Sequence, residues 1–167
     1  MAIVLLPQNL AALGVKRQGD GKAADLLTVY ATTYPVLTNY KALCGRLGWH
    51  PYAGGSMDMQ GDRSIQGFLT SGYRDELIEG RTNSPHLYAV ALDMAVGGFV
   101  EQARVARHAA DLFYRIGFYP DNGFLHIDLM SPEWIARYNA SRYWVRKNGI
   151  YKPFDNIGDA ITYSGGH

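Results

Sequence analysis

The chain has 167 residues, about the size of one domain, and its composition of 47% apolar and 19% charged residues predicts a folded core and excludes intrinsic disorder. The formal net charge of +1 excludes the strongly basic surface typical of nucleic-acid-binding domains, so no nucleic-acid partner is expected. The apolar start, residues 1–6, is too short to span a membrane and has no basic segment, so we expect neither a signal peptide nor membrane insertion.

The first third of the chain predicts helices. Residues 22–33 and 35–47 are expected to form two of them, because apolar residues in the second recur at helical period, Pro35 suits its first turn and Gly48 suits its end. Cys44 lies in that apolar stripe, so we expect a buried structural thiol. As the single cysteine, Cys44 also excludes an internal disulfide.

The middle of the chain predicts strands around a further helix. Residues 48–64 are rich in Gly, Asp and Ser and are expected to be loop, and residues 65–70 are expected to form a short strand. Residues 89–96 alternate between bulky side chains and a face of small ones on which Asp93 is the polar group. Residues 99–116 then follow helical spacing, and Gly117 is expected to end that helix.

A second alternating segment, residues 124–129, places His126 and Asp128 on one strand face. Ser131 and Pro132 predict the start of a short helix, and Asn148-Gly149 between two apolar segments predicts a two-residue hairpin turn. These elements predict an α+β fold in which helices flank a small, mostly antiparallel sheet.

We expect one domain, residues 1–167, and a monomer. It would comprise a helical N-terminal part (1–64), a metal-site core (65–130) and a C-terminal helix and hairpin (131–167).

Two histidines and a carboxylate are candidate metal ligands. If the two alternating strands are neighbours, Asp93 and His126 project from one sheet face with Cβ atoms about 5 Å apart. His86 lies seven positions before Asp93, so it must sit in a turn ahead of the strand, which Pro85 helps to fix. Three such ligands and an open position are typical of catalytic zinc. The alternative is structural: a paired Asp93 and a hydrogen-bonded core histidine at 126.

The order of three motifs resembles the zinc D-Ala-D-Ala carboxypeptidase family of bacterial and bacteriophage cell-wall peptidases, which shares its fold with the hedgehog signalling domain. The motifs are Ser71-Gly72-Tyr73-Arg74, Ser84-x-His86-x6-Asp93 and Phe124-x-His126-x-Asp128, within residues 65–130. The resemblance implies a hedgehog/DD-peptidase-like fold and a Zn²⁺ ion held by His86, Asp93 and His126. Ala89 departs from the pattern, because the family usually has glycine there and a methyl group would crowd a tight backbone.

The general base is the open point of the site. Members of the family use a histidine two positions before the last ligand or a carboxylate three positions before it, and here these positions hold Phe124 and Gly123. Asp128 could act as the base or orient a ligand. Asp121 could reach the site from its turn, or simply belong to that turn.

By the same resemblance, Arg74 would clamp a substrate carboxylate or polarise the scissile carbonyl, the alternative being an ion pair with its acidic neighbours. His50, His108 and His167 have no comparable context, and no site role is expected for them.

The resemblance implies a zinc metallopeptidase that hydrolyses peptide stems or cross-links of bacterial peptidoglycan. The missing signal peptide favours a bacteriophage endolysin or virion-associated lysin, made in the host cytoplasm and acting on the cell wall, over a secreted DD-carboxypeptidase. Two alternatives remain open: a zinc-bearing binding module of the same fold without catalysis, and a phage structural domain without metal.

Overall fold

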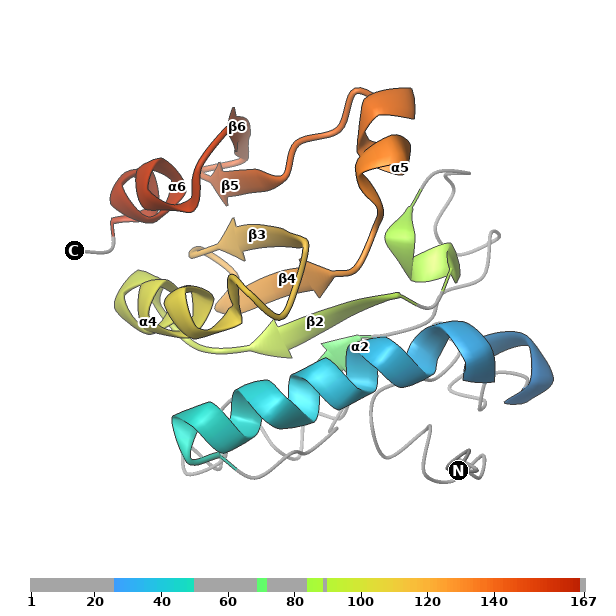
Figure 1. Cartoon of the computed structure of the whole chain (residues 1–167). Helices are drawn as coiled ribbons and strands as arrows, with labels where there is room; N and C mark the ends of the chain where they lie inside the picture. Colours follow the sequence, from blue (N-terminus) through green and yellow to red (C-terminus); the bar gives the residue numbers. More distant parts are fainter. Residues whose placement is uncertain (1–25, 50–68, 72–83, 89, 166–167) are drawn as a thin grey trace.

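The computed structural model describes residues 26–49, 69–71, 84–88 and 90–165, and a six-stranded sheet forms its centre (Figure 1). The strands lie in the order β1-β2-β4-β3-β5-β6; β3 and β5 pair in parallel and the other pairs are antiparallel. The predicted α+β class with a mostly antiparallel sheet is therefore confirmed. The strands span β1 (Leu69–Ser71), β2 (Ala91–Ala95), β3 (Arg115–Tyr119), β4 (Phe124–Asp128), β5 (Tyr143–Lys147) and β6 (Ile150–Phe154).

The helices pack mainly on one face of the sheet. Helix α4 contacts both α2 and α6, and α4 and α6 also contact strands β3 and β5 respectively (Figure 1). Within the described residues, no helix combines the length and the apolar character that crossing a bilayer requires. The helices are α2 (Leu26–Leu47), α4 (Phe99–Ala109), α5 (Pro132–Arg137) and α6 (Ile157–Ser164), with a short 3-10 helix, η2 (Pro85–Tyr88).

Alternation along the strands gives the sheet a core face and a second, polar face. The side chains of Leu92, Met94, Leu125 and Ile127 are all buried in the main apolar cluster. Their neighbours in the sequence on β2 and β4 point to the opposite face, where Asp93, His126 and Asp128 are buried as well. One face of the sheet therefore supplies the core and the other carries the candidate site.

The expected break between two N-terminal helices is wrong, because α2 runs without interruption from Leu26 to Leu47 and includes Pro35. A proline inside a helix costs about 3 kcal/mol. Burial of Val36, Tyr40 and Leu43 offsets that cost, since each large apolar side chain contributes about 1.5–3 kcal/mol. Cys44 is buried as expected, and burial raises the pKa of its thiol. Residues 22–25 and most of the expected loop, 50–64, lie outside the described residues.

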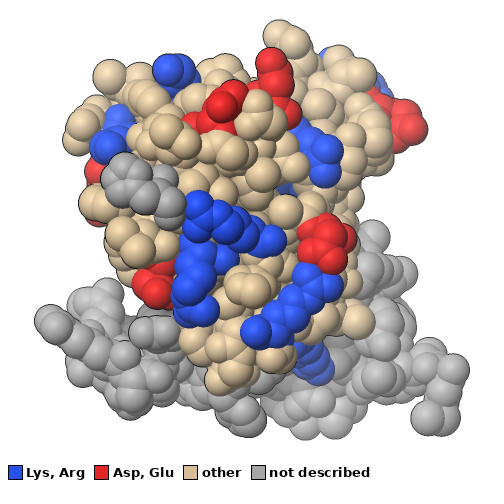
Figure 2. All heavy atoms as spheres, turned by 60° about the vertical axis from the view of Figure 1, so that its left-hand side comes forward, with Lys and Arg blue, Asp and Glu red and all other residues tan. Residues whose placement is uncertain are grey.

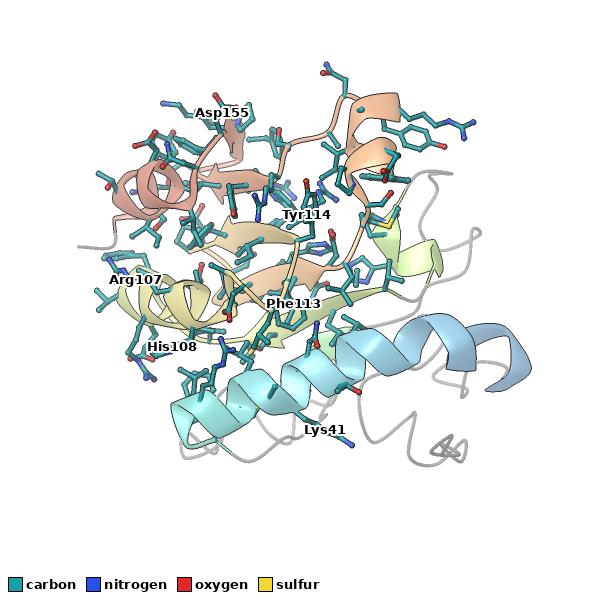
Figure 3. All side chains as sticks on the ribbon, in the orientation of Figure 1. Lys41, Arg107, His108, Phe113, Tyr114 and Asp155 are labelled. Carbon is teal, nitrogen blue, oxygen red and sulfur yellow. The ribbon has the colours of Figure 1, made fainter. Side chains whose placement is uncertain are left out.

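The expected helix over residues 99–116 is also wrong in its last third. Helix α4 ends at Ala109, Phe113 enters the core (Figure 3), and β3 begins at Arg115. Gly117 does not end a helix; it lies in the middle of β3. The apolar residues from 113 to 118 satisfy helical and strand spacing alike, and pairing with both β4 and β5 decides in favour of a strand.

The C-terminal predictions are confirmed where the structure describes them. Asn148 and Gly149 have positive φ values of 53° and 74° in the β5–β6 turn, and Ser131 caps α5 by accepting the N–H of Trp134 at 3.2 Å. Strand β1 covers the end of the expected strand 65–70, whose first residues lie outside the described ranges. Helix α6 was not predicted, although Asn156, which caps it by accepting the N–H of Asp159, was a visible signal.

Polar contacts join α2 to the segment that follows α4. On the side shown in Figure 2, Lys and Arg side chains gather near the middle of the face with acidic side chains beside them. In the described residues, Arg104 pairs with Glu101 within α4 at 2.9 Å, and Arg46 of α2 pairs with Asp111, just after α4. Asn39 of α2 also donates to the carbonyl of Leu112 at 2.6 Å, so polar contacts as well as apolar packing join α2 to α4.

Gly117→Ala tests the close approach of β3 and the indole of Trp144. A Cβ atom at this position would lie 2.2 Å from two ring atoms of Trp144, so something must shift. We expect the free energy of unfolding, measured by chemical denaturation, to fall by about 1–3 kcal/mol, the usual cost of overpacking. Gly45→Ala is the matched control, because no heavy atom lies within 4 Å of its added Cβ and alanine favours a helix. Equal stabilities of the two variants would contradict the packing described.

Candidate metal centre

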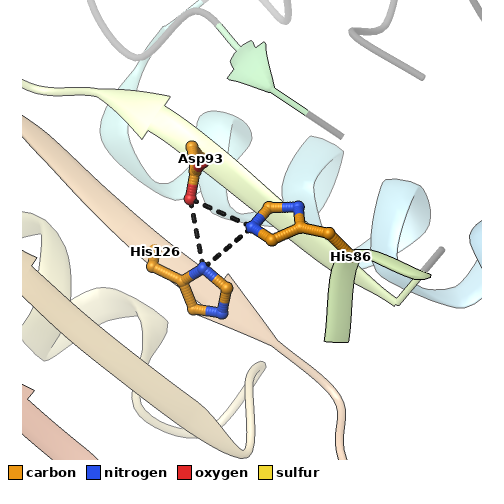
Figure 4. Close-up of side chains that lie close together, drawn as sticks. All are labelled: His86, Asp93 and His126. Carbon is orange, nitrogen blue, oxygen red and sulfur yellow. Dashed lines mark hydrogen bonds and ion pairs between the residues drawn. The ribbon is translucent and has the colours of Figure 1, made fainter. Parts of the chain in front are cut away.

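The ligand atoms of His86, Asp93 and His126 converge on one point of the polar face (Figure 4). Nε2 of His86 lies 3.4 Å from Oδ1 of Asp93 and 3.2 Å from Nδ1 of His126, and Nδ1 of His126 lies 3.1 Å from the same Oδ1. All three residues are buried, with exposed fractions of 3% for His86 and 6% for the other two. The structure thus brings together the three residues that the sequence proposed as ligands.

Local structure explains how each side chain reaches this point. Asp93 of β2 and His126 of β4 are direct partners in the antiparallel pairing, so their side chains rise side by side from the same face. His86 lies in η2, ahead of β2, which agrees with the expected turn position. The hydroxyl of Ser84 accepts the backbone N–H of His86 at 3.3 Å and so helps to set the path of that turn.

The triangle of ligand atoms matches the requirements of a metal ion. Ligands at 2.0–2.1 Å in a tetrahedral arrangement are separated from each other by about 3.3 Å. The observed separations of 3.1, 3.2 and 3.4 Å surround that value. A single hydrogen on Nδ1 of His126 cannot point at both Asp93 and His86, whereas one cation would satisfy all three atoms. The residues present therefore fit a metal ion, and two imidazoles favour a transition metal over Ca²⁺ or Mg²⁺.

Asp128 orients His126 from the opposite edge of its ring. Nε2 of His126 lies 2.8 Å from Oδ2 of Asp128, which leaves Nδ1 to face Asp93 and His86. Oδ2 of Asp128 also accepts from Arg115 at 3.0 Å, and Oδ1 accepts the backbone N–H of Met130 at 3.0 Å. A carboxylate behind a ligating histidine fixes its tautomer and raises its basicity.

Two tryptophans enclose the guanidinium of Arg115. Its central carbon lies 5.0 Å from the ring centre of Trp134 and 4.6 Å from that of Trp144. Its Nε donates to the carbonyl of Ser141 at 2.8 Å. Trp144 also packs on His126, with 5.2 Å between ring centres. Aromatic packing and hydrogen bonds thus fix Arg115, which in turn holds Asp128.

The electrostatics of the centre favour a cation. Burial on its own would lower the pKa of His126, but hydrogen bonds to Asp128 and Asp93, together with their charges, outweigh it and raise the pKa to about 9. Burial would raise the pKa of Asp93, but His86 and the hydrogen bonds from His126 and His86 hold it well below its usual range. Among the described residues, the centre contains two buried carboxylates, Asp93 and Asp128, and only Asp128 is paired with a guanidinium, that of Arg115. The carboxylate of Asp93 is therefore available to a proton on the histidines or to a metal ion.

The other residues proposed from the sequence lie elsewhere or outside the described ranges. Asp121 is exposed in the β3–β4 turn, where its carboxylate accepts the backbone N–H of Asn148 and so joins two turns. His108 is exposed on α4 (Figure 3). Ser71, the first residue of the motif that contains Arg74, pairs with Asp93 and so lies beside the centre. Arg74 itself lies outside the described residues, and so do His50 and His167.

Sequence reasoning missed Arg115 and Trp144, because both depend on the existence of β3. Once β3 is placed, the register across the sheet runs Asp93, His126, Gly117, Trp144 in one row, and Ala91, Asp128, Arg115 in the next. The available signal was Gly117 itself, a residue without a side chain between two apolar residues of a strand.

Comparisons with known proteins add no assignment: no family model, no curated protein and no solved structure matches this chain.

Asp128→Asn should weaken metal binding without removing a ligand. The amide keeps the shape of the side chain but loses the charge that makes His126 a strong ligand, and such changes typically reduce metal affinity 10–100-fold. Competition with a chromophoric chelator measures the dissociation constant. Asp159→Asn, on α6, is the matched control and should bind as the wild type does. An unchanged affinity in Asp128→Asn would refute the orienting role.

Metal affinity should rise with pH. In the metal-free protein His126 is protonated below its pKa of about 9, and a metal displaces that proton because a ligating imidazole must be neutral. The association constant for zinc should therefore increase about tenfold per pH unit from 7 to 8.5 and level off above 9. The raised pKa also stabilises the metal-free fold below the unfolded value of 6.5, and this contribution is lost as the pH rises through 9. Titration calorimetry at several pH values measures the slope, and a flat profile would contradict the coupling.

Proposed function

We propose that the chain is a zinc-dependent peptidase that hydrolyses peptide stems or cross-links of bacterial peptidoglycan. The convergence of two imidazole nitrogens and one carboxylate oxygen at 3.1–3.4 Å carries the proposal. This donor set is the kind that catalytic zinc sites use, with a fourth position left for water. The substrate class rests on the resemblance of the three motifs to the D-Ala-D-Ala carboxypeptidase family.

We also propose that the domain has a hedgehog/DD-peptidase-like fold. The positions of the motif residues in the sheet support this proposal. His86 lies in a turn ahead of the strand that carries Asp93, and His126 lies on the antiparallel neighbour of that strand. Ser71, the first residue of the remaining motif, pairs with Asp93 across the other edge of β2.

In this proposal, His86, Asp93 and His126 hold the metal ion, and zinc bound there would supply a water of lowered pKa and polarise the scissile carbonyl. Asp128 keeps Nδ1 of His126 directed at the ion. Its two oxygens accept from His126, Arg115 and the N–H of Met130, so we assign it to positioning rather than to proton abstraction. Arg74 would bind a carboxylate of the substrate.

A facial set of two histidines and a carboxylate also binds Fe(II) in oxygenases, so the donor set alone does not choose between zinc and iron. The resemblance to a family of zinc peptidases favours zinc. A bacteriophage lysin is the proposed setting.

One observation favours a second candidate, a zinc-bearing module without catalysis. Phe124 and Gly123 stand where the family has its proton-transferring residues, and Asp128 is engaged with His126 and Arg115.

Digestion of purified cell walls of known chemistry separates the two candidates. The zinc-loaded protein should release new amino termini, and mass spectrometry of the fragments should identify the bond that is cut. His126→Ala should lose the release together with the zinc, while His108→Ala, which alters an exposed histidine of α4, should retain both. Stoichiometric zinc without cleavage of any wall type would refute the peptidase and leave the binding module. Iron in place of zinc would refute both.

A further inference from the structure

We infer that the hydroxyl group of Tyr119 is a catalytic hydrogen-bond donor of this centre, placed to stabilise the oxyanion that forms when the substrate carbonyl is attacked. This inference rests on the proposed function. It does not supply the missing general base; it adds stabilisation of the transition state at a centre where Phe124 and Gly123 carry no proton-transferring group and Asp128 is engaged with His126.

The position of Tyr119 follows from the sheet register. Gly117 of β3 is the direct partner of His126, and Tyr119 follows two residues later on the same face. Tyr119 pairs with Phe124 of β4. On the other side of Phe124 lies Ala95 of β2, whose side chain is small. Tyr119 is thus one row away from the ligands Asp93 and His126.

The hydroxyl group of Tyr119 is held by Trp144, whose indole also packs on the ligand His126. Nε1 of Trp144 donates to the Tyr119 oxygen at 3.2 Å. The indole lies directly over Gly117, where an added Cβ would come within 2.6 Å of that nitrogen, and its ring centre is 5.2 Å from that of His126. The glycine at 117 therefore makes room for the indole that fixes the phenol beside the centre.

The ring of Tyr119 is also held in place. It stacks on Phe124 with ring centres 4.3 Å apart and an interplanar angle of 14°. Its backbone carbonyl accepts from Gln102 at 3.1 Å and from the N–H of Gly123 at 2.9 Å. A donor fixed in this way needs little reorganisation when charge develops on the substrate, and this is the condition for strong electrostatic stabilisation.

The phenol keeps its proton at neutral pH. Burial raises the pKa of Tyr119, the hydrogen bond from Trp144 opposes the rise, and the negative charge of Asp93 adds to it. Because the Trp144 N–H occupies a lone pair of the oxygen, the O–H hydrogen is directed elsewhere. Among the described residues no acceptor contacts it, so it is available to a substrate oxygen. The proton stays on Tyr119 throughout, and the interaction is a hydrogen bond rather than a proton transfer.

Tyr119→Phe removes the hydroxyl and keeps the stacked ring. Zinc content should stay at the wild-type level, and the melting temperature should fall only by the few degrees that the lost acceptor of Trp144 Nε1 costs. The kcat for wall-peptide cleavage should fall about 10²-fold with little change in KM, because the bond forms with the oxyanion. Tyr163→Phe, on α6, is the matched control and should behave as the wild type does. Unchanged kcat in Tyr119→Phe overturns the inference while the proposed peptidase stands.

A binding measurement separates this inference from the peptidase proposal. Calorimetry with a phosphinate analogue of the D-Ala-D-Ala dipeptide, whose anionic oxygen imitates the oxyanion, needs no turnover. Zinc-loaded Tyr119→Phe should bind it about tenfold more weakly than the wild type and Tyr163→Phe do. Equal affinities, or no binding by the wild type, overturn the inference even if no wall is cleaved. Weaker binding by Tyr119→Phe in a protein that cleaves no wall supports the donor role and refutes only the peptidase.

Discussion

The hydrogen bond between Asp128 and Nε2 of His126 decides which nitrogen of that ring faces Asp93 and His86. With a separation of 2.8 Å and a completely buried carboxylate, it leaves Nδ1 as the atom available to a metal ion. The carboxylate is itself neutralised by Arg115 at 3.0 Å. Loss of either partner of a buried ion pair is destabilising, because the remaining charge would be left without compensation. The geometry of the candidate centre therefore depends on Asp128 and Arg115, which are not themselves among the three candidate ligands.

The sheet makes these contacts possible by placing rows of side chains on its polar face. Asp93, His126, Gly117 and Trp144 occupy one row, and Ala91, Asp128 and Arg115 occupy the next. A shift of register by one residue would turn His126 and Asp128 into the core. Burial of the core side chains of these strands stabilises the fold and sets the strand register. The same register places the candidate ligands, so the geometry of the site depends on the packing of the core.

The convergence of His86, Asp93 and His126 could be predicted from the sequence because its signals are local. Two alternating strands placed Asp93 and His126 on faces that can meet, and the odd spacing of His86 from Asp93 assigned it to a turn. The turn at Asn148-Gly149 and the helix cap at Ser131 were also predictable, because both depend on short-range backbone interactions, and the structure contains both. The resemblance to a peptidase family named the same three ligands, although its substrate and reaction are proposals for this chain.

Features that depend on tertiary contacts could not be predicted in this way. The residues of β3 have a spacing that also suits a helix, and only pairing with β4 and β5 reveals the strand, so Arg115 and its contact with Asp128 were missed. The continuous path of α2 through Pro35 is a second case, because burial against the core outweighs a local preference. Helix and strand propensities describe each segment by itself, whereas tertiary packing determined both the strand β3 and the uninterrupted helix α2.

X-ray absorption spectroscopy of the zinc-loaded protein shows directly whether His86, Asp93 and His126 bind the ion. We expect one zinc per chain, with two imidazole nitrogens and light oxygen ligands at about 2.0–2.1 Å and a coordination number near four. Zinc that shows no imidazole scattering, or a protein that binds no zinc at this site, would contradict this expectation.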